Sequence, residues 1–466
     1  MNIFRAIANK GEDILENAHV RAPWQGEDGH EHMMADPVGY LAKRRTERSG
    51  ARSRRNIMVG GFAQTILFAM TGGVYLTGFL LSLGADAGFV NTVVILLNAC
   101  VIIQLFAPAL FERVRRRRRI IFPILAINHA LTLFVVPLLV LAGTPNEVML
   151  PLFCVLVTVA GALGALIMPG MSAWHIGNIP EEKRLGYFAL STIAGVIVSS
   201  SAPFLGGIAV DTLKGIWGES ASLAVIRLVL LFFAAMQMFF YYRVDEPEYP
   251  KSTEKNSLGG VLRSLKAHPG YLKVILALAV WNLSAVIPGQ YFIAYLLEDL
   301  SVSYTFITSI SLAFIAAIIF LTPVWKRLIA RFRLHNAFSS AMMLYALYPA
   351  GCLFVSAATL FIYPVSVIFS YMFAVCLNLC ISMAPYINLP EENRTLFLSV
   401  YNVAQALAQI CGLFIGRVIY DACSGMGLPF GIEPARVLMG VLSVMIAFSG
   451  FVIRFALRPR AEAREA

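Results

Sequence analysis

The sequence predicts an all-α membrane protein built from two parallel six-helix bundles, and three observations support this prediction. Hydrophobic residues make up 58% of the 466-residue chain and charged residues only 14%, whereas soluble domains carry about 25% charged residues. The apolar residues come in long blocks such as Phe89 to Phe111 and Leu223 to Tyr242, and a helix needs about 20 apolar residues to cross the hydrocarbon core. Motifs of the first half of the chain also return in the second half in the same order.

The apolar blocks predict twelve membrane helices in two halves. We expect a tail over residues 1–55, a first bundle over 56–243, a central loop over 244–270, a second bundle over 271–457 and a tail over 458–466. Pro, Ser, Lys and Glu in the stretch from Asp245 to Gly260 mark the connector. The expected helices are 57–83, 89–111, 119–142, 148–171, 185–211, 222–243, 271–297, 303–325, 335–357, 359–384, 394–420 and 434–456.

The positive residues predict the orientation of the chain, because cytoplasmic loops carry an excess of Lys and Arg. Alternate loops and the C-terminal end hold most of these residues: Arg113, residues 115–119, Lys183, Arg184, Lys326, Arg327, Arg331, Arg333, Arg394, Arg454, Arg458, Arg460 and Arg464. The opposite loops and helix ends offer only Lys214, Arg227, Arg417 and Arg436. We therefore expect both termini in the cytoplasm. The net charge of +10 comes largely from basic residues in short loops next to the expected membrane helices. This placement argues against nucleic acid as a partner.

One charged heptapeptide occurs twice. "NIPEEKR" begins at Asn178, and "NLPEENR" begins 210 positions later at Asn388. "GVYLTGFLL" from Gly73 is matched by "GQYFIAYLL" from Gly289, 216 positions later. The pairs Gly206 and Gly416, Asp211 and Asp421, and Arg227 and Arg436 repeat as well, the last pair opening the final helix of each half. Since each half has an even number of helices, both copies keep one orientation, as in a parallel repeat.

Taken together, the two parallel halves, the basic loop "RVRRRRR" and the longer central loop resemble the major facilitator superfamily over about residues 55–457. "PALFERVRRRRR" is similar to a degenerate form of that family's cytoplasmic loop motif, with Glu112 and Arg113 at its acidic-basic pair but without its glycines. The resemblance implies a multi-pass permease of the plasma (inner) membrane that works by alternating access.

The repeated heptapeptide has two interpretations. Locally, Asn178 and Asn388 would cap a helix start, with the glutamates at its positive end. Alternatively, the two loops meet when the cytoplasmic side closes and form a charged gate. The candidate gate residues are Glu112, Arg113, Glu181, Glu182, Arg184, Glu391, Glu392 and Arg394.

Polar and aromatic residues within the expected helices are candidates for solute binding, because polar groups at membrane depth are costly. In the first helix they follow one stripe, and the seventh and eleventh helices add amides. Hydrogen bonding between helices is the alternative role. The candidates are Gln64, Phe68, Thr71, Tyr75, Asn282, Gln290, Tyr291, Asn378, Asn402, Gln405 and Gln409.

No Asp, Glu, Lys or Arg lies near the middle of an expected helix, which favours an uncharged solute over phosphate esters or dicarboxylates. We expect a transporter of a small polar organic solute such as a sugar or glycoside. An exporter of amphipathic drug-like compounds is the alternative, and a non-transporting receptor or scaffold with the same fold is a further one. We expect no catalytic residues, metal or cofactor; coupling to H⁺, to Na⁺ or to neither stays open. The expected partners are the solute and the lipid bilayer, and we expect a monomer.

Overall fold

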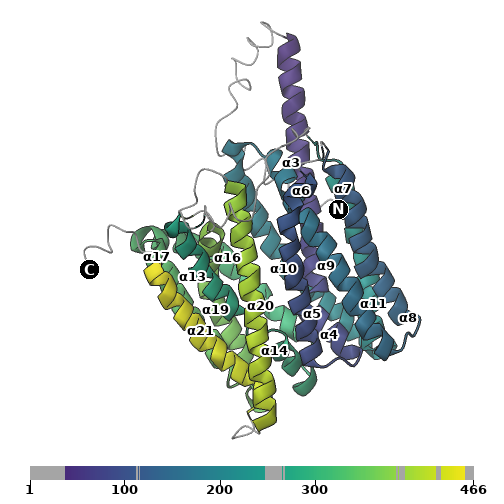
Figure 1. Ribbon diagram of the computed structural model, residues 1–466, viewed down its shortest axis with the longest axis vertical. Coiled ribbons are helices and arrows are strands. Elements are labelled where there is room, and N and C mark those ends of the chain that lie inside the picture. The colour runs from purple at the N-terminus through teal and green to yellow at the C-terminus, as the bar shows by residue number, and fades with distance from the viewer. Residues whose placement is uncertain are drawn as a thin grey trace.

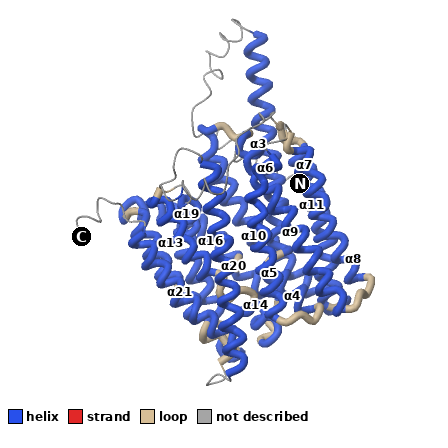
Figure 2. The backbone as a smooth tube through the Cα atoms, viewed as in Figure 1, coloured by secondary structure: helices blue, strands red, loops and turns tan. Residues whose placement is uncertain are grey.

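The computed structural model describes residues 37–111, 114, 116–246, 265, 268–384, 387, 394–426 and 432–456, except for the side chains of 37–48, 108–109, 181–186, 189, 382, 394–396 and 398–399. The described part of the chain is helical throughout apart from turns and short loops, and it contains no strand (Figure 2). Helices satisfy their own backbone hydrogen bonds, as a chain in hydrocarbon must. The all-helical fold predicted from the apolar blocks is confirmed.

The N-terminal half holds the first six predicted spans (Figure 1). Its elements are α3 (Pro37–Thr71), α4 (Gly73–Ser82), α5 (Ala87–Cys100), η1 (Val101–Phe106), α6 (Ala107–Phe111), α7 (Arg118–His129), η2 (Ala130–Val135), α8 (Val136–Leu141), α9 (Asn146–Gly177), α10 (Glu181–Trp217) and α11 (Glu219–Tyr242).

The C-terminal half holds the other six. Its elements are α13 (Pro269–Ala285), α14 (Tyr291–Ala294), η3 (Tyr295–Asp299), α15 (Tyr304–Ile310), α16 (Leu312–Phe332), α17 (Leu334–Tyr345), α18 (Leu347–Cys352), η4 (Ala357–Thr359), α19 (Ile362–Met383), α20 (Arg394–Met426) and α21 (Pro434–Ala456).

Within the described residues, ten helical segments are long and apolar enough to cross a membrane. The two remaining spans of the expected twelve are segments that the backbone interrupts, 269–299 and 334–352. The apolar cores follow the division into halves. The large core of the N-terminal half takes only Tyr304 among its buried members from the other half, whereas the C-terminal half has two cores of its own. The two-bundle arrangement therefore matches the sequence repeat.

The first and seventh spans break at corresponding places. Helix α3 ends at Thr71 and α4 starts at Gly73, whose φ is +51°. The seventh span leaves the helical path between α13 and α14, where Gly289 has a φ of +49°. Only glycine adopts this left-handed region at little cost. These two glycines stand at the same position of the repeated motif, so the duplication also copied the helix break.

The break in the seventh span is covered by a glycine pair of α20. A Cβ atom at Gly412 would lie 2.1 Å from the carbonyl oxygen of Leu283, and one at Gly416 would lie 2.0 Å from that of Ile287. The two glycines are spaced i, i+4 on one helix face. Their missing side chains let α20 approach the backbone where the seventh span loses its regular hydrogen bonds, as small residues do in membrane helix packing.

The first helix starts earlier than predicted. The first helix was expected to begin at residue 57, but α3 begins at Pro37 and projects beyond its neighbours (Figure 1). The segment "YLAKRRTERSGARSRR" is rich in Leu, Ala, Lys, Arg and Glu, which favour a helix. The helical conformation therefore extends past the apolar block that the prediction used as its boundary.

Among the described residues, the hydrogen bonds between the halves gather at the end of the bundle opposite the start of α3. The hydroxyl of Thr77 donates to Oε1 of Gln290 at 2.6 Å. Nearby, Nδ2 of Asn91 donates to the carbonyl oxygen of Leu413 at 3.2 Å. The first and seventh spans thus meet just beyond their breaks, and the helices α4, α14, α5 and α20 converge at this end (Figure 1).

We predict opposite effects for three glycine-to-alanine variants. Gly61→Ala, in a helical site with nothing within 4 Å of the new Cβ, should raise stability by about 0.5–1 kcal/mol because alanine is the better helix former. Gly73→Ala also meets open space, but its left-handed backbone should make it cost about 1–2 kcal/mol. Gly289→Ala should cost more, since its Cβ would lie 2.5 Å from Oδ1 of Asn91.

Thermal unfolding of the purified variants in detergent measures this order. Gly61→Ala serves as the matched control on the same membrane span. Equal melting temperatures for Gly61→Ala and Gly73→Ala would contradict the helix break at Gly73.

Candidate functional site

Three amides of the C-terminal half form one hydrogen-bonded group. Nδ2 of Asn282 on α13 donates to Oε1 of Gln405 on α20 at 3.0 Å. Nε2 of Gln409 donates to Oδ1 of Asn282 at 2.8 Å, and Nε2 of Gln405 donates to the carbonyl oxygen of Ile275 at 3.2 Å. The structure thus brings together three of the predicted residues. Because their polar atoms are matched, the group tolerates burial midway along two membrane helices.

The predicted stripe on the first span divides between buried and exposed positions. Oε1 of Gln64 accepts a hydrogen bond from the hydroxyl of Tyr241 at 2.9 Å, so this amide bonds within its own half. The hydroxyl of Thr71 donates to the carbonyl oxygen of Leu67 at 2.7 Å and is satisfied by its own helix. Phe68, one turn before the break, is 63% exposed.

The two tyrosines of the repeated motif differ in their partners. The hydroxyl of Tyr75 donates to the carbonyl oxygen of Pro203, and its ring lies 6.0 Å from that of Tyr304. The counterpart Tyr291 is buried and stacks on Tyr420 with a centroid distance of 4.1 Å. Among the described residues, the hydroxyl of Tyr291 has no hydrogen-bond partner.

Two predicted asparagines point away from the packed core. Asn402, one turn before Gln405 on α20, is exposed. Asn378 on α19 is exposed too, and its Nδ2 donates to the carbonyl oxygen of Ala374 at 3.0 Å. The stripe 402, 405 and 409 therefore has its last two members in the amide group and its first member outside it.

The candidate gate residues fall largely outside the described part of the chain. Glu112, Arg113, Glu391 and Glu392 are not described at all. Glu181, Glu182, Arg184 and Arg394 have a described helical backbone, but their side chains are not described. The charged gate remains a prediction.

The helix-cap interpretation of the first heptapeptide is wrong for Asn178. This residue closes α9, and the N-cap of α10 is Pro180. Nδ2 of Asn178 donates to the carbonyl oxygens of Trp174 and Asp245, both at 3.0 Å. The prediction failed because α9 runs past its expected end at 171 to Gly177, so that the amide serves carbonyl groups instead of the N–H groups of α10.

The sequence did not reveal a cap that one half provides for the other. Oδ2 of Asp211, near the end of α10, accepts a hydrogen bond from the backbone N–H of Thr305 at 2.7 Å. Asp211 also forms an ion pair with Lys214 at 2.9 Å. The hydroxyl of Tyr304 donates to Oε1 of Glu219 at 2.6 Å. A carboxylate at the N-terminus of α15 is favourable, but the sequence alone shows no link between positions 211 and 305.

Within the described residues, no group of three or more His, Cys, Asp or Glu side chains is placed to hold a metal ion. The described candidate groups are instead neutral amides, hydroxyls and aromatic rings, and both halves contribute them. The sequence profile of the Major Facilitator Superfamily matches residues 57–413 of the chain.

The chain belongs to the Major Facilitator Superfamily. Solved structures with the fold of this superfamily cover most of the chain. A bacterial homologue of the iron transporter ferroportin in an inward-facing state has a TM-score of 0.65 at 14% identity, covering 88% of this chain and 99% of that one. A partially occluded inward-open conformation of the xylose transporter XylE from E. coli has a TM-score of 0.61 at 12% identity, covering 86% and 96%.

A mutant of the nucleoside transporter NupG also has a TM-score of 0.61 at 12% identity, covering 87% of this chain and 100% of that one. No curated protein sequence matches the chain. This member of the superfamily is therefore an integral multi-pass membrane protein with a transporter fold, and its solute has to be inferred from its own residues.

Two substitutions on α20 separate packing amides from exposed ones. Gln405→Ala removes the hydrogen bonds from Asn282 and to the Ile275 carbonyl oxygen and should cost about 1–3 kcal/mol of stability. Asn402→Ala, one turn away on the same helix, removes an exposed side chain and should change stability by less than about 0.5 kcal/mol. Thermal unfolding of both variants measures the difference. An equal loss of stability in the two variants would contradict the hydrogen-bonded group of Asn282, Gln405 and Gln409.

Proposed function

We propose that this protein carries a small, uncharged polar solute, such as a sugar or a glycoside, across the inner membrane by alternating access. The observation on which the proposal rests is the chemistry of the helices that flank the boundary between the halves. They offer amides, hydroxyls and aromatic rings, and no described charged side chain joins the amide group of Asn282, Gln405 and Gln409. Such groups suit sugar hydroxyls, which both donate and accept hydrogen bonds.

The exposed residues support a solute path beside these amides. Asn402 is exposed on the same helix as the amide group, and an exposed amide at membrane depth is costly against lipid but not against water or a polar solute. Phe68 on the first span adds an exposed ring that can stack on the apolar face of a sugar. The xylose and nucleoside transporters among the similar structures also carry sugar-containing solutes, which agrees with this class.

The proposed orientation has both termini in the cytoplasm, following the positive residues of the loops. The described hydrogen bonds between the halves, such as Thr77 with Gln290, then lie at the extracellular end, and we infer that this conformation is open to the cytoplasm. Two of the similar structures are described as inward-facing or inward-open. In the opposite state, the two heptapeptide loops would approach each other, with Glu182 and Glu392 as candidate gate charges.

A solute screen tests the substrate class. Uncharged monosaccharides, glycosides and nucleosides should raise the melting temperature of the purified protein, while sugar phosphates and dicarboxylates should not. Asn402→Ala should weaken the response to the best solute about 5- to 30-fold, the loss of roughly 1–2 kcal/mol. Stabilisation only by amphipathic cations would favour the exporter alternative and overturn this proposal.

A wedge at the extracellular contact tests alternating access. A Cβ at Gly207 on α10 would already lie 2.8 Å from Oγ1 of Thr308, so Gly207→Trp should force the halves apart at this end. Gly215→Trp, on the same helix but with nothing within 4 Å of the new Cβ, is the matched control. In a chain without other cysteines, a cysteine at the buried position Thr77 should react with an extracellular thiol reagent at least about 10-fold faster in Gly207→Trp, a shift of roughly 1.4 kcal/mol.

The same assay addresses the heptapeptide gate. Glu182→Gln combined with Glu392→Gln should slow the labelling of the cysteine, because weakening the cytoplasmic contact favours the conformation that buries Thr77. A few exposed or half-buried pairs give about 1–2 kcal/mol, or roughly 5- to 30-fold. Unchanged labelling in both Gly207→Trp and the glutamine pair would refute the rocking of the two halves.

A further inference from the structure

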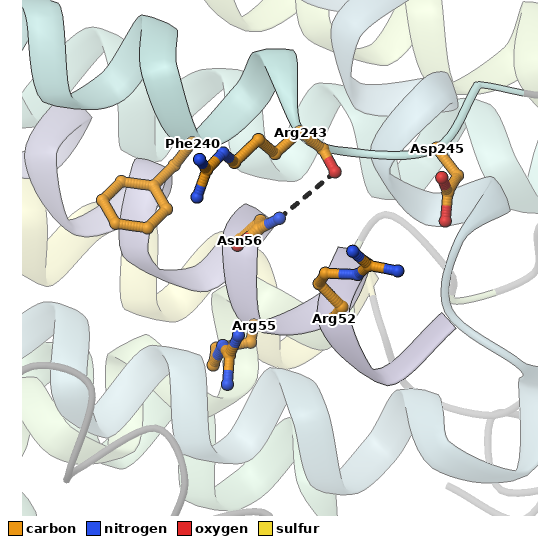
Figure 3. Close-up of a pocket in the computed structure, with 6 residues that line it drawn as sticks. All are labelled: Arg52, Arg55, Asn56, Phe240, Arg243 and Asp245. Atoms are coloured by element: carbon orange, nitrogen blue, oxygen red, sulfur yellow. Dashed lines mark hydrogen bonds between the residues drawn. The ribbon is translucent and has the colours of Figure 1, made fainter. Parts of the chain in front are cut away.

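A basic pocket lies at the end of the N-terminal half where α3 passes the end of α11. It has a volume of about 390 Å³ and combines arginines of both elements with one carboxylate (Figure 3). Its lining residues are Arg52, Arg55, Asn56, Phe240, Arg243 and Asp245. A second pocket of about 270 Å³ adjoins it and shares Arg243 and Asp245; it adds Arg116, Arg118, Tyr242, Val244 and Glu246.

The backbone around the pocket is held by local hydrogen bonds. Nδ2 of the buried Asn56 donates to the carbonyl oxygen of Arg243 at 3.2 Å (Figure 3). The ring nitrogen of Trp174 donates to the carbonyl oxygen of Asp245 at 2.9 Å. The hydroxyl of Ser53 donates to Oδ2 of Asp245 at 2.8 Å. These hydrogen bonds hold the backbone of residues 243–245 against α3 and α9, so the backbone that carries the arginines is fixed in place.

The pocket carries an excess of positive charge. Five arginines line the two connected pockets, against the carboxylates of Asp245 and Glu246. Oδ2 of Asp245 already accepts from serine, and Oε1 of Glu246 accepts from the backbone N–H of Arg118 at 2.9 Å. Among the described residues, the guanidinium groups of Arg52 and Arg243 form no hydrogen bond or ion pair.

The guanidinium of Arg243 is held by an aromatic ring and keeps its donors free. Its Cζ lies 4.2 Å from the centroid of the Phe239 ring. A guanidinium that contacts a ring through its face leaves the N–H groups at its edge available. Arg118 lies over Tyr242, with 4.7 Å between Cζ and the ring centroid, but its Nη1 already donates to the carbonyl oxygen of Tyr242 at 3.0 Å. The pocket thus offers oriented forks of N–H donors, which match the oxygens of a phosphate.

The position of the pocket relative to the bilayer follows from the outer face of α11. Val229, Phe232, Phe239 and Tyr242 are large, exposed and spaced three, seven and three residues apart, which places them on one face of the helix. Such a stripe on a membrane span faces the acyl chains. The stripe ends directly before Arg243, so the pocket opens at the level where acyl chains give way to headgroups.

We propose that this pocket binds the phosphate group of an anionic phospholipid. The lipid-facing stripe would contact the acyl chains, and Arg52 and Arg243 would donate to the phosphate oxygens. A soluble phosphate ester has the same chemistry, but it would leave the adjacent apolar stripe unused. Basic pockets between membrane helices are suited to anionic headgroups in this way. The site is separate from the solute path, since it lies on the outer surface of one half.

Lipid titration of the full-length protein in neutral detergent, read by native mass spectrometry, tests the proposal. Dioleoylphosphatidylglycerol should half-saturate the protein at a concentration at least about 5-fold lower than dioleoylphosphatidylcholine, whose choline repels the arginines. Arg52→Gln combined with Arg243→Gln should raise the concentration for phosphatidylglycerol about 10-fold or more, as the loss of one or two charge-assisted hydrogen bonds implies.

The matched control removes two charges elsewhere on the same side. Lys326→Gln combined with Arg327→Gln changes exposed residues of α16 and should leave the titration within about twofold of the unchanged protein. Arg243→Gln alone, at an exposed position, gives a second reading if the double variant unfolds. Equal binding of both lipids, or equal binding by all variants, would overturn the proposal. Competition by submillimolar glycerol 3-phosphate would assign the site to soluble phosphate esters and overturn the lipid assignment.

Discussion

The need to satisfy every backbone polar group inside the bilayer governs this structure. It makes the described chain helical, and it limits interruptions to places where another segment covers the exposed carbonyls. The seventh span shows the consequence most clearly. Its helix breaks before Gly289, and α20 presents Gly412 and Gly416 to the carbonyl oxygens of Leu283 and Ile287. Without those two glycines, the backbone of the break and that of α20 would collide.

The same breaks determine where the halves meet. The helical pieces beyond them, α4 and α14, contact each other across the boundary between the halves through Thr77 and Gln290. The parts before the breaks carry Asn282, the member of the amide group on the seventh span, and the exposed ring of Phe68. Each of the two spans is therefore divided into a piece that contacts the other half and a piece that flanks the proposed solute path. Because both spans break at a corresponding glycine, the helical pieces before and after the break can point in different directions. Each bundle still keeps its own apolar core.

Duplication produced equal sequences at several positions but unequal contacts. Asp211 caps α15 in the other half, whereas its counterpart Asp421 pairs with Arg417 at 3.6 Å within its own helix. Arg417 in turn donates to Oγ1 of Thr92 at 2.8 Å. The N-terminal half thus contacts its partner through the carboxylate of Asp211, whereas the C-terminal half does so through the guanidinium of Arg417. A rocking motion would break chemically different bonds on the two sides.

The two arginines of the last helices diverge in the same way. Arg436 opens α21 and donates from Nε to the carbonyl oxygen of Leu353 at 2.8 Å. Arg227 does not open its helix as predicted; it lies two turns into α11, only 4% exposed, with Cζ 4.5 Å from the ring centroid of Phe79. The aromatic face provides the attraction that a carboxylate would otherwise provide. The prediction was wrong for Arg227 because α11 begins at Glu219, before the expected start at residue 222, so that this arginine lies further inside the helix.

The membrane class, the twelve spans and the division into two parallel halves could be predicted from the order of residues in the chain. These features depend on apolar length and on repeated motifs, and both are properties of the chain taken in order. The sequence also singled out Asn282, Gln405 and Gln409, because amides inside apolar blocks are conspicuous. The folded chain was needed to show that these three amides bond to one another while Asn402 stays exposed. It was also needed to show that Asn178 closes α9 and that Asp211 caps α15. It alone showed that Arg52 and Arg243 line one pocket. Each of these facts depends on hydrogen-bond geometry between residues far apart in the chain, and no periodicity or local propensity encodes that geometry.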